Sequence, residues 1–229
     1  NTNLVTVMVS GSSFDIKKWI NDVPNLVLMG YAGMEGGAAL ANVLSGKVNP
    51  SGKLTYTFPK NLADVPEYVW DCFDEASQTD YYKEGVFVGY RYYDTFDVPT
   101  QYDFGYGLSY TTFEFGELQL NQSKIKDNES ITATIEITNT GNRTGAEVVQ
   151  LYIGDEKASV KRPVKELKGF QKIRLNPGES KVVTFTINPQ DLKYFEGLTK
   201  EWRLEPGKFT VFVGNSVKNI HATKPFEIL

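Results

Sequence analysis

The sequence predicts an incomplete α/β unit, an α/β sandwich remnant, followed by an all-β, immunoglobulin-like sandwich. Over the first 60 residues, two short apolar runs alternate with two helical segments. From residue 113 onward, short runs of alternating polarity are separated by turns that contain Asn, Pro or Gly. A long aromatic-rich stretch lies between these patterns. We therefore expect three parts: an α/β part over 1–60, a linker over 61–112 and a sandwich over 113–229.

The N-terminal part has the order strand, helix, strand, helix. Leu4 to Val9 and Leu26 to Met29 are short apolar runs, which is typical of strands buried on both faces of a parallel sheet. Phe14 to Ile20 predicts a short helical turn. Glu35 to Leu44 predicts a helix, because Ala and Leu dominate it, and Gly46 follows as a stop. This alternation is typical of an α/β sheet.

Two strands and two short helices do not close a hydrophobic core by themselves. We therefore expect the missing partner strands to precede Asn1, with the chain beginning in the middle of a domain. The linker that follows is unusually long. Connections of such length are either functional or linkers, and aromatic and acidic side chains crowd this one.

The C-terminal part shows the period of two that half-buried strands require. Ile131, Ala133, Ile135 and Ile137 alternate with polar residues, and runs around Phe185 and Val211 behave likewise. The expected turns are Asn139-Thr140-Gly141-Asn142, Asn176-Pro177-Gly178 and Glu205-Pro206-Gly207. The pattern and length fit an immunoglobulin-like sandwich. No cysteine pair could bridge its sheets, so the fibronectin type III variant is favoured.

Composition excludes several classes of function. The net charge is −4 with both signs interleaved, so no basic surface for nucleic acid and no polybasic membrane anchor is expected. No apolar run is long enough for a membrane helix. Cys72 is the only cysteine and His221 the only histidine, so neither a disulfide nor a metal-ligand cluster is predicted. His221 lies in an apparent final strand, where we expect a structural role.

Four groups of residues carry a resemblance to family 3 glycoside hydrolases, the β-glucosidase and β-xylosidase family. They are Gly33-Met34-Glu35-Gly36-Gly37; Asn49-Pro50-Ser51-Gly52-Lys53-Leu54 with Phe58-Pro59; Glu84-Gly85, Tyr90-Arg91-Tyr92-Tyr93-Asp94 and Phe104-Gly105-Tyr106-Gly107-Leu108-Ser109-Tyr110; and Asn139-Thr140-Gly141, Gly145-Ala146-Glu147-Val148-Val149-Gln150-Leu151-Tyr152, Arg162-Pro163, Leu167-Lys168-Gly169-Phe170 and Pro177-Gly178-Glu179. Each is modest alone, but together and in this order they span nearly the whole chain.

The resemblance implies an enzyme with an (α/β)8 barrel, an α/β sandwich and a fibronectin type III-like domain, of which this chain is similar to the end of the second and all of the third. It also implies retaining hydrolysis by an Asp nucleophile and a Glu acid/base. The family's Ser-Asp-Trp-like and Ser-x-Glu-Gly-like contexts are both absent here. We therefore expect no catalytic residue in this chain, both carboxylates upstream, and no cofactor.

Two residues are weak candidates for substrate binding. Glu35 stands among glycines at a helix entrance, where an acid also favours the helix dipole without any catalytic role. Trp70 could stack on a sugar, although an anchor for its loop is the more ordinary role. The acidic residues between Asp71 and Asp80 lack calcium-loop spacing. Glu84 and Arg91 are expected to form an ion pair bracing the linker.

The sequence thus predicts the C-terminal part of a retaining β-glucosidase acting on terminal non-reducing β-D-glucosyl residues. The chain alone is expected to be inactive. Its partner is the remainder of the enzyme, and its substrate a β-glucoside oligosaccharide or aryl glucoside. The alternatives are a β-xylosidase or exo-glucanase of the same family, or a non-catalytic carbohydrate-binding or adhesion module. A periplasmic or secreted location and a cytoplasmic one both stay open.

Overall fold

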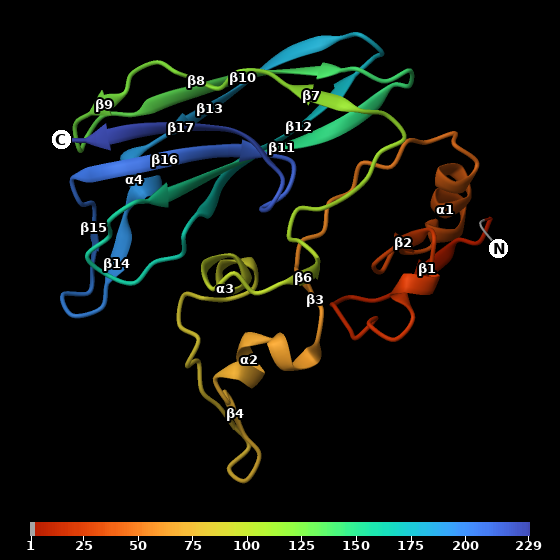
Figure 1. Ribbon diagram of the computed structural model, residues 1–229, viewed down its shortest axis with the longest axis horizontal. Helices are drawn as coiled ribbons and strands as arrows, with labels where there is room; N and C mark the ends of the chain where they lie inside the picture. Colours follow the sequence, from red (N-terminus) through yellow and green to blue (C-terminus); the bar gives the residue numbers. More distant parts are fainter. Residues whose placement is uncertain (1–2) are drawn as a thin grey trace.

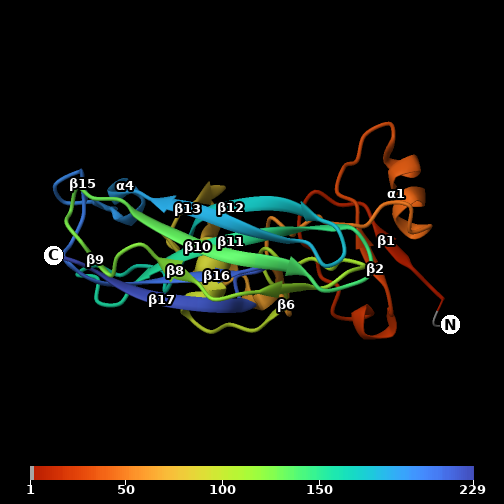
Figure 2. The same ribbon diagram turned by 90° about the horizontal axis from the view of Figure 1, so that it is seen from above.

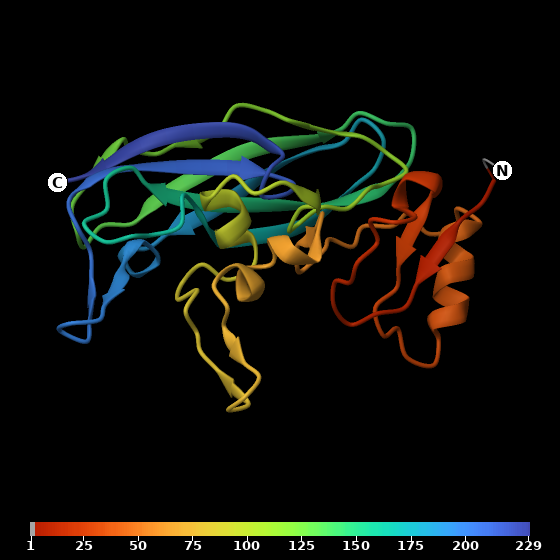
Figure 3. The same ribbon diagram turned by 60° about the horizontal axis from the view of Figure 1, so that its bottom comes forward.

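The computed structural model describes residues 3–229, so the first two residues of the expected N-terminal part lie outside the described residues. The molecule is elongated, with a β-sandwich at one end, a small α/β unit at the other and an arm that projects between them (Figure 1). Figure 3 shows the arm hanging clear of both. The predicted combination of an α/β unit and a β-sandwich is confirmed.

The α/β unit contains two parallel strands and two helical segments. Its elements are β1 (Thr6–Met8), a 3₁₀ turn η1 (Ile20–Asp22), β2 (Leu26–Leu28) and α1 (Gly36–Leu44). Thr6 pairs with Leu26 and Met8 with Leu28. A two-stranded sheet is marginal by itself, and this one gathers only a small buried cluster around Met8 and Ile16.

Several apolar side chains of this unit face solvent. Leu4 is 50% exposed, Val9 64%, Tyr31 81% and Met34 102%. The strands were expected to be buried on both faces, yet β2 is only half-buried along its whole length. The α/β unit therefore leaves open the apolar surface that a complete α/β domain would cover.

The linker, together with the strand just before it, is built from short elements that pack on one another and on the sandwich. They are β3 (Phe58–Pro59), η2 (Leu62–Asp64), α2 (Pro66–Val69), β4 (Phe73–Asp74), β5 (Thr79–Asp80), α3 (Tyr90–Thr95) and β6 (Thr100–Tyr102). Strands β4 and β5 form the hairpin of the projecting arm. Strands β3 and β6 pair in antiparallel fashion and close the base of the linker.

The sandwich packs a sheet of β13, β10, β7 and β8 on a sheet of β12, β11, β16, β17 and β9 (Figure 2). These elements are β7 (Phe113–Phe115), β8 (Gln119–Leu120), β9 (Lys124–Ile125), β10 (Ile131–Asn139), β11 (Gly145–Asp155), β12 (Glu166–Leu175), β13 (Ser180–Ile187), β16 (Gly207–Gly214) and β17 (Ile220–Ile228). A helical turn α4 (Pro189–Leu192) and a hairpin of β14 (Tyr194–Glu196) and β15 (Glu201–Arg203) lie at the end far from α1.

The alternation in the sequence explains the sandwich core. In β10 the residues at 131, 133, 135 and 137 are at most 1% exposed, and they face Phe185, Val211 and their neighbours. Each predicted turn falls between two elements, at the ends of β10, β12 and β15. Because a shift of one residue would turn every core side chain to solvent, this pattern fixes the strand register.

Candidate functional site

The first candidate, Glu35, lies on the surface of the α/β unit. It is the residue before α1 and is exposed, and its side chain does not cap the helix. Gly33 precedes it with φ of +72°, which a glycine adopts without strain. The carboxylate therefore stands at a helix N-terminus facing solvent. Glu35 does not line the surface cavity that lies between the loop after α1 and the sandwich.

The second candidate, Trp70, packs inside the linker. Its ring contacts Tyr92 and Phe96 in edge-on arrangements, with ring centroids 5.1 and 5.8 Å apart. It joins a buried cluster that contains Phe87 and Tyr93. Edge-to-face pairs of this kind stabilise a fold, so in this chain Trp70 anchors the base of the arm.

The acidic residues of the arm make local contacts. Asp74 accepts hydrogen bonds from the Ser77 hydroxyl at 2.7 Å and from the amide of Ala76 at 3.0 Å. These bonds, that of Ser77 foremost, lower the pKa of Asp74. No group of three or more His, Cys, Asp or Glu within residues 3–229 could hold a metal ion.

The expected ion pair of Glu84 with Arg91 is wrong. Glu84 is buried and accepts a hydrogen bond from the Cys72 thiol, with Sγ and Oε2 3.2 Å apart. Arg91 instead pairs with Glu166 of β12, at 3.3 Å. Gly89, with φ of +56°, precedes α3, which carries Arg91 toward the sandwich. Arg91 therefore braces the linker against the sandwich and not against the arm.

The tyrosines of α3 divide between two surfaces. Tyr90 stacks on Phe104 with ring centroids 4.6 Å apart and meets Tyr152 of the sandwich edge-on at 6.0 Å. Its hydroxyl accepts a hydrogen bond from the Leu167 amide at 2.8 Å, and burial raises its pKa. Tyr92 and Tyr93 turn the other way, toward Trp70. One turn of helix thus ties the arm to the sandwich.

The α/β unit meets the sandwich through Asn49 and Lys53. The Asn49 amide donates to the Thr144 carbonyl at 3.1 Å and accepts from the Ser109 hydroxyl and the Tyr110 amide, at 3.0 and 2.8 Å. Lys53 Nζ lies 2.7 Å from Glu147 Oε1, and both side chains are about nine-tenths buried. Both contacts come from the Asn-Pro-Ser-Gly-Lys turn, which therefore positions the unit on the sandwich.

His221 lies beside this junction, where its ring stacks on Phe115 with centroids 4.2 Å apart. Burial of one face lowers the pKa of His221; Glu147 acts in the opposite direction and Lys53 reinforces the effect. Between the folded pKa and the usual value near 6.5, the unfolded chain binds more protons than the folded chain. The contribution of His221 to the free energy of unfolding is therefore fully present above pH 6.5, and it is lost as the pH drops from there toward the folded pKa.

We expect urea unfolding to show a lower free energy at pH 5.5 than at pH 7.5, with part of the difference due to His221. His221→Gln should reduce the slope of stability against pH in this window, because the remaining groups keep their own titrations. An unchanged slope would contradict the assignment. Because the ring is partly open to solvent, the expected effect is small.

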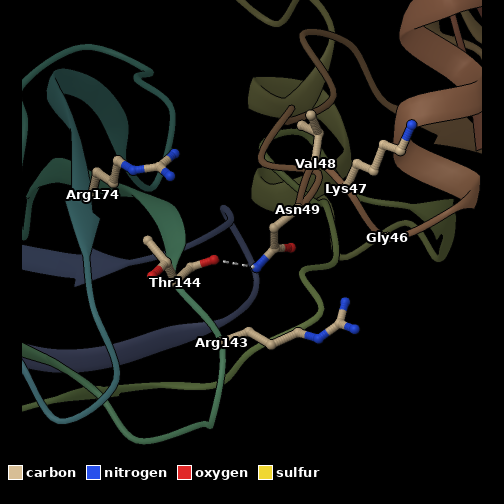
Figure 4. A pocket seen from close by; sticks show the side chains of 7 residues that line it. All are labelled: Gly46, Lys47, Val48, Asn49, Arg143, Thr144 and Arg174. Carbon is tan, nitrogen blue, oxygen red and sulfur yellow. Dashed lines mark hydrogen bonds between the residues drawn. The ribbon is translucent and has the colours of Figure 1, made fainter.

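A surface cavity of about 280 Å³ opens where the loop after α1 faces the sandwich (Figure 4). Gly46, Lys47, Val48 and Asn49 line one side. Arg143, Thr144 and Arg174 line the other, from the β10–β11 turn and from β12. A hydrogen bond from the Asn49 amide to the Thr144 carbonyl joins the two sides (Figure 4). Sequence reasoning missed this cavity, because its cations come from segments far apart in the chain.

Comparisons with known proteins match both halves of the chain. Residues 1–90 match the glycosyl hydrolase family 3 C-terminal domain, and residues 147–217 match the fibronectin type III-like domain. The β-glucosidase BoGH3A of Bacteroides ovatus is 44% identical over all of this chain, which covers 31% of that protein. Thermostable β-glucosidase B of Acetivibrio thermocellus is 43% identical over 96% of the chain and 29% of its own length.

Solved structures of β-glucosidases also match the chain over nearly all of its length. The family 3 β-glucosidase of Bifidobacterium adolescentis superposes on the whole chain with a TM-score of 0.92 and 39% identity, and the chain covers 33% of it. β-Glucosidase 3B of Thermotoga neapolitana, in complex with glucose, gives 0.90 and 42% over 97% of this chain and 31% of its own.

The fold and these matches define the C-terminal domains of a glycoside hydrolase. The chain belongs to glycoside hydrolase family 3. It spans about a third of the length of the relatives it matches.

Proposed function

We propose that the chain is the C-terminal part of a retaining β-glucosidase that hydrolyses terminal non-reducing β-D-glucosyl residues. The observation that carries the proposal is the match of the entire chain to one third of single-chain β-glucosidases. Its division into an α/β part over 1–60, a linker over 61–112 and a sandwich over 113–229 belongs to the same proposal. So does the expectation that both catalytic carboxylates lie in the remainder of the enzyme.

The open apolar surface of the α/β unit supports this role. Val9, Tyr31 and Met34 are exposed beside a sheet of only two strands. Further strands that cover this surface would complete the α/β domain. Each Å² of apolar area that they bury would stabilise the assembly by roughly 25 cal/mol. In this arrangement the chain holds the α/β domain beside a catalytic barrel, so that the acid/base and the pocket are correctly placed.

Mixing experiments test the proposal. We expect the 229-residue chain alone not to hydrolyse p-nitrophenyl β-D-glucopyranoside. Co-expression with the N-terminal two thirds of the enzyme should restore activity in a complex of the two polypeptides. A variant with Met34→Asp and Val9→Asp on the open surface should lose both association and activity, while Leu198→Asp, on the distant β14–β15 hairpin, should retain both.

The same assay separates the alternatives. Faster release of p-nitrophenol from p-nitrophenyl β-D-xyloside than from the glucoside would indicate a β-xylosidase. Cleavage confined to β-glucan ends would indicate an exo-glucanase. Activity of the chain without a partner, or a stable complex with no activity on any of these substrates, would contradict the proposal. No helix within residues 3–229 is long and apolar enough to cross a bilayer.

A further inference from the structure

The projecting arm carries large apolar side chains that the described chain leaves exposed to solvent. The arm comprises residues 66–88, from α2 through the β4–β5 hairpin to the segment before α3. Tyr82 is 85% exposed, Tyr68 64% and Phe73 50%, and Tyr81 and Val86 are exposed as well. A group of exposed large apolar side chains on one projecting element is typical of a surface that contacts another part of a protein.

The inner side of the arm is already packed, so these side chains have no place in its core. Trp70 and Phe87 belong to the cluster at the base of the arm. The Cys72 thiol donates to the Glu84 carboxylate, and both residues are buried. Lys161 of the sandwich lies 5.2 Å from the centre of the Phe87 ring. The arm is therefore a preorganised element, and such an element loses little conformational entropy when it binds.

The arm and the incomplete α/β unit extend from the same side of the sandwich (Figure 3). The unit leaves its own apolar surface open around Val9 and Met34. The family 3 β-glucosidase of Bifidobacterium adolescentis superposes on 100% of this chain, arm included, and the chain covers 33% of that enzyme. In an enzyme of that length, the other two thirds have to be accommodated beside these two exposed surfaces.

We propose that the arm is a docking element for the part of the enzyme outside this chain, with its aromatic residues packed on an apolar surface of that part. The inference rests on the proposed function, since it assumes that such a part exists. It adds a second contact, separate from the open surface of the α/β unit. Because aromatic residues are enriched in the cores of interfaces and polar residues at their rims, Tyr82, Phe73 and Tyr68 would form the centre of this contact.

The charge of the arm favours this partner over a second copy of the chain. Residues 71–83 contain one base, Lys83, and four acids, Asp71, Asp74, Glu75 and Asp80, so their formal charge is −3. Two copies that met arm to arm in a symmetric dimer would bring these acidic segments together, and like charges across an interface are unfavourable. We therefore expect the receiving surface to be apolar, with basic residues at its edge.

Hydroxyl-radical footprinting of the active complex between this chain and the N-terminal two thirds of the enzyme tests the proposal. We expect Tyr82 and Phe73 to be oxidised at least about fivefold more slowly in the complex than in the isolated chain, because the core of an interface excludes water. Phe195, 53% exposed on the distant β14–β15 hairpin, is the internal control, and its rate should not change. The protection should persist on dilution, at concentrations where sedimentation shows one copy of each polypeptide.

Substitution of the exposed rings gives a second measurement. Phe73→Ser with Tyr82→Ser should weaken association with the N-terminal part at least about tenfold, because aromatic anchors carry much of the free energy of binding at an interface. Phe195→Ser removes a ring of similar exposure and should leave the affinity unchanged. Both variants should keep the melting temperature of the isolated chain, since the replaced rings are exposed.

Three results would overturn this inference and leave the proposed function in place. The first is an active complex in which Tyr82 and Phe73 are oxidised as fast as in the isolated chain. The second is equal affinity of the wild type and the double variant for the N-terminal part. The third is protection that already accompanies a dimer of the isolated chain, which would mean that the arm binds a second copy. If the unchanged chain neither associates with the N-terminal part nor restores activity, the proposed function fails, and this inference fails with it.

Discussion

Asn139→Ala is expected to lower the free energy of unfolding of the sandwich by about 3 kcal/mol. The Asn139 side chain is fully buried at the end of β10. Its amide donates to the carbonyls of Arg143 and Leu175, at 2.8 and 3.0 Å. Its oxygen accepts from the Thr111 hydroxyl at 2.7 Å and from the Gly141 amide at 3.1 Å. Alanine leaves all four groups without this partner, and the Leu175 carbonyl and the Thr111 hydroxyl lose it in a buried place.

Urea unfolding monitored by tryptophan fluorescence gives the measurement. Asn142→Ala changes an exposed residue of the same turn and should stay within about 0.5 kcal/mol of the wild type. Asn139→Asp should destabilise as strongly as Asn139→Ala, because a carboxylate oxygen would face the Arg143 and Leu175 carbonyls. Equal stability of the Asn139→Ala and Asn142→Ala variants would contradict the assigned role.

Asn139 also shows how far the sequence predicts the fold. The Asn139-Thr140-Gly141-Asn142 cluster predicts a turn between two alternating runs, and β10 and β11 do meet there. The burial of Asn139 could not be predicted, because it depends on the Leu175 and Thr111 segments folding over the same point. Alternation reports on a strand's own two faces and not on what packs against its end.

In the linker, the sequence predicts neither the elements nor their contacts. Its helices and strands are two to six residues long, too short for a periodic signal. The predicted pair of Glu84 and Arg91 rested on closeness in sequence, but the left-handed Gly89 and the helix after it separate the two side chains. The cavity escaped prediction for a similar reason, since Lys47, Arg143 and Arg174 line it from segments that lie far apart in the chain.

Lys53→Met is the second substitution with a large expected effect. It leaves Glu147 buried without its counter-ion, and removal of one partner of a buried pair costs about 3–5 kcal/mol. Lys53 also donates to the Gly107 carbonyl at 3.0 Å, so the change releases the linker at the same place. Because Lys53 belongs to the α/β unit and Glu147 to β11, the loss should fall mainly on the contact between the two parts.

Hydrogen exchange locates the loss. In Lys53→Met we expect faster amide exchange in β1, β2 and α1, whereas β10 and β13 keep their protection because their core does not involve Lys53. Lys60→Met removes an exposed lysine without an ion pair in the described part of the chain and should match the wild type.

A double variant separates charge from packing. Glu147 accepts further hydrogen bonds, from the Val148 amide at 2.7 Å and from Asn215 at 3.3 Å. Glu147→Gln keeps an oxygen for the Val148 amide, gives up the weaker bond from Asn215, and removes the charge that Lys53→Met leaves unpaired. The combination should therefore lose less stability than the sum of the two single changes. Additive losses would mean that the pair contributes no coupling, and the junction would then depend on Asn49 and on the hydrogen bond from the Tyr110 hydroxyl to the Val43 carbonyl of α1.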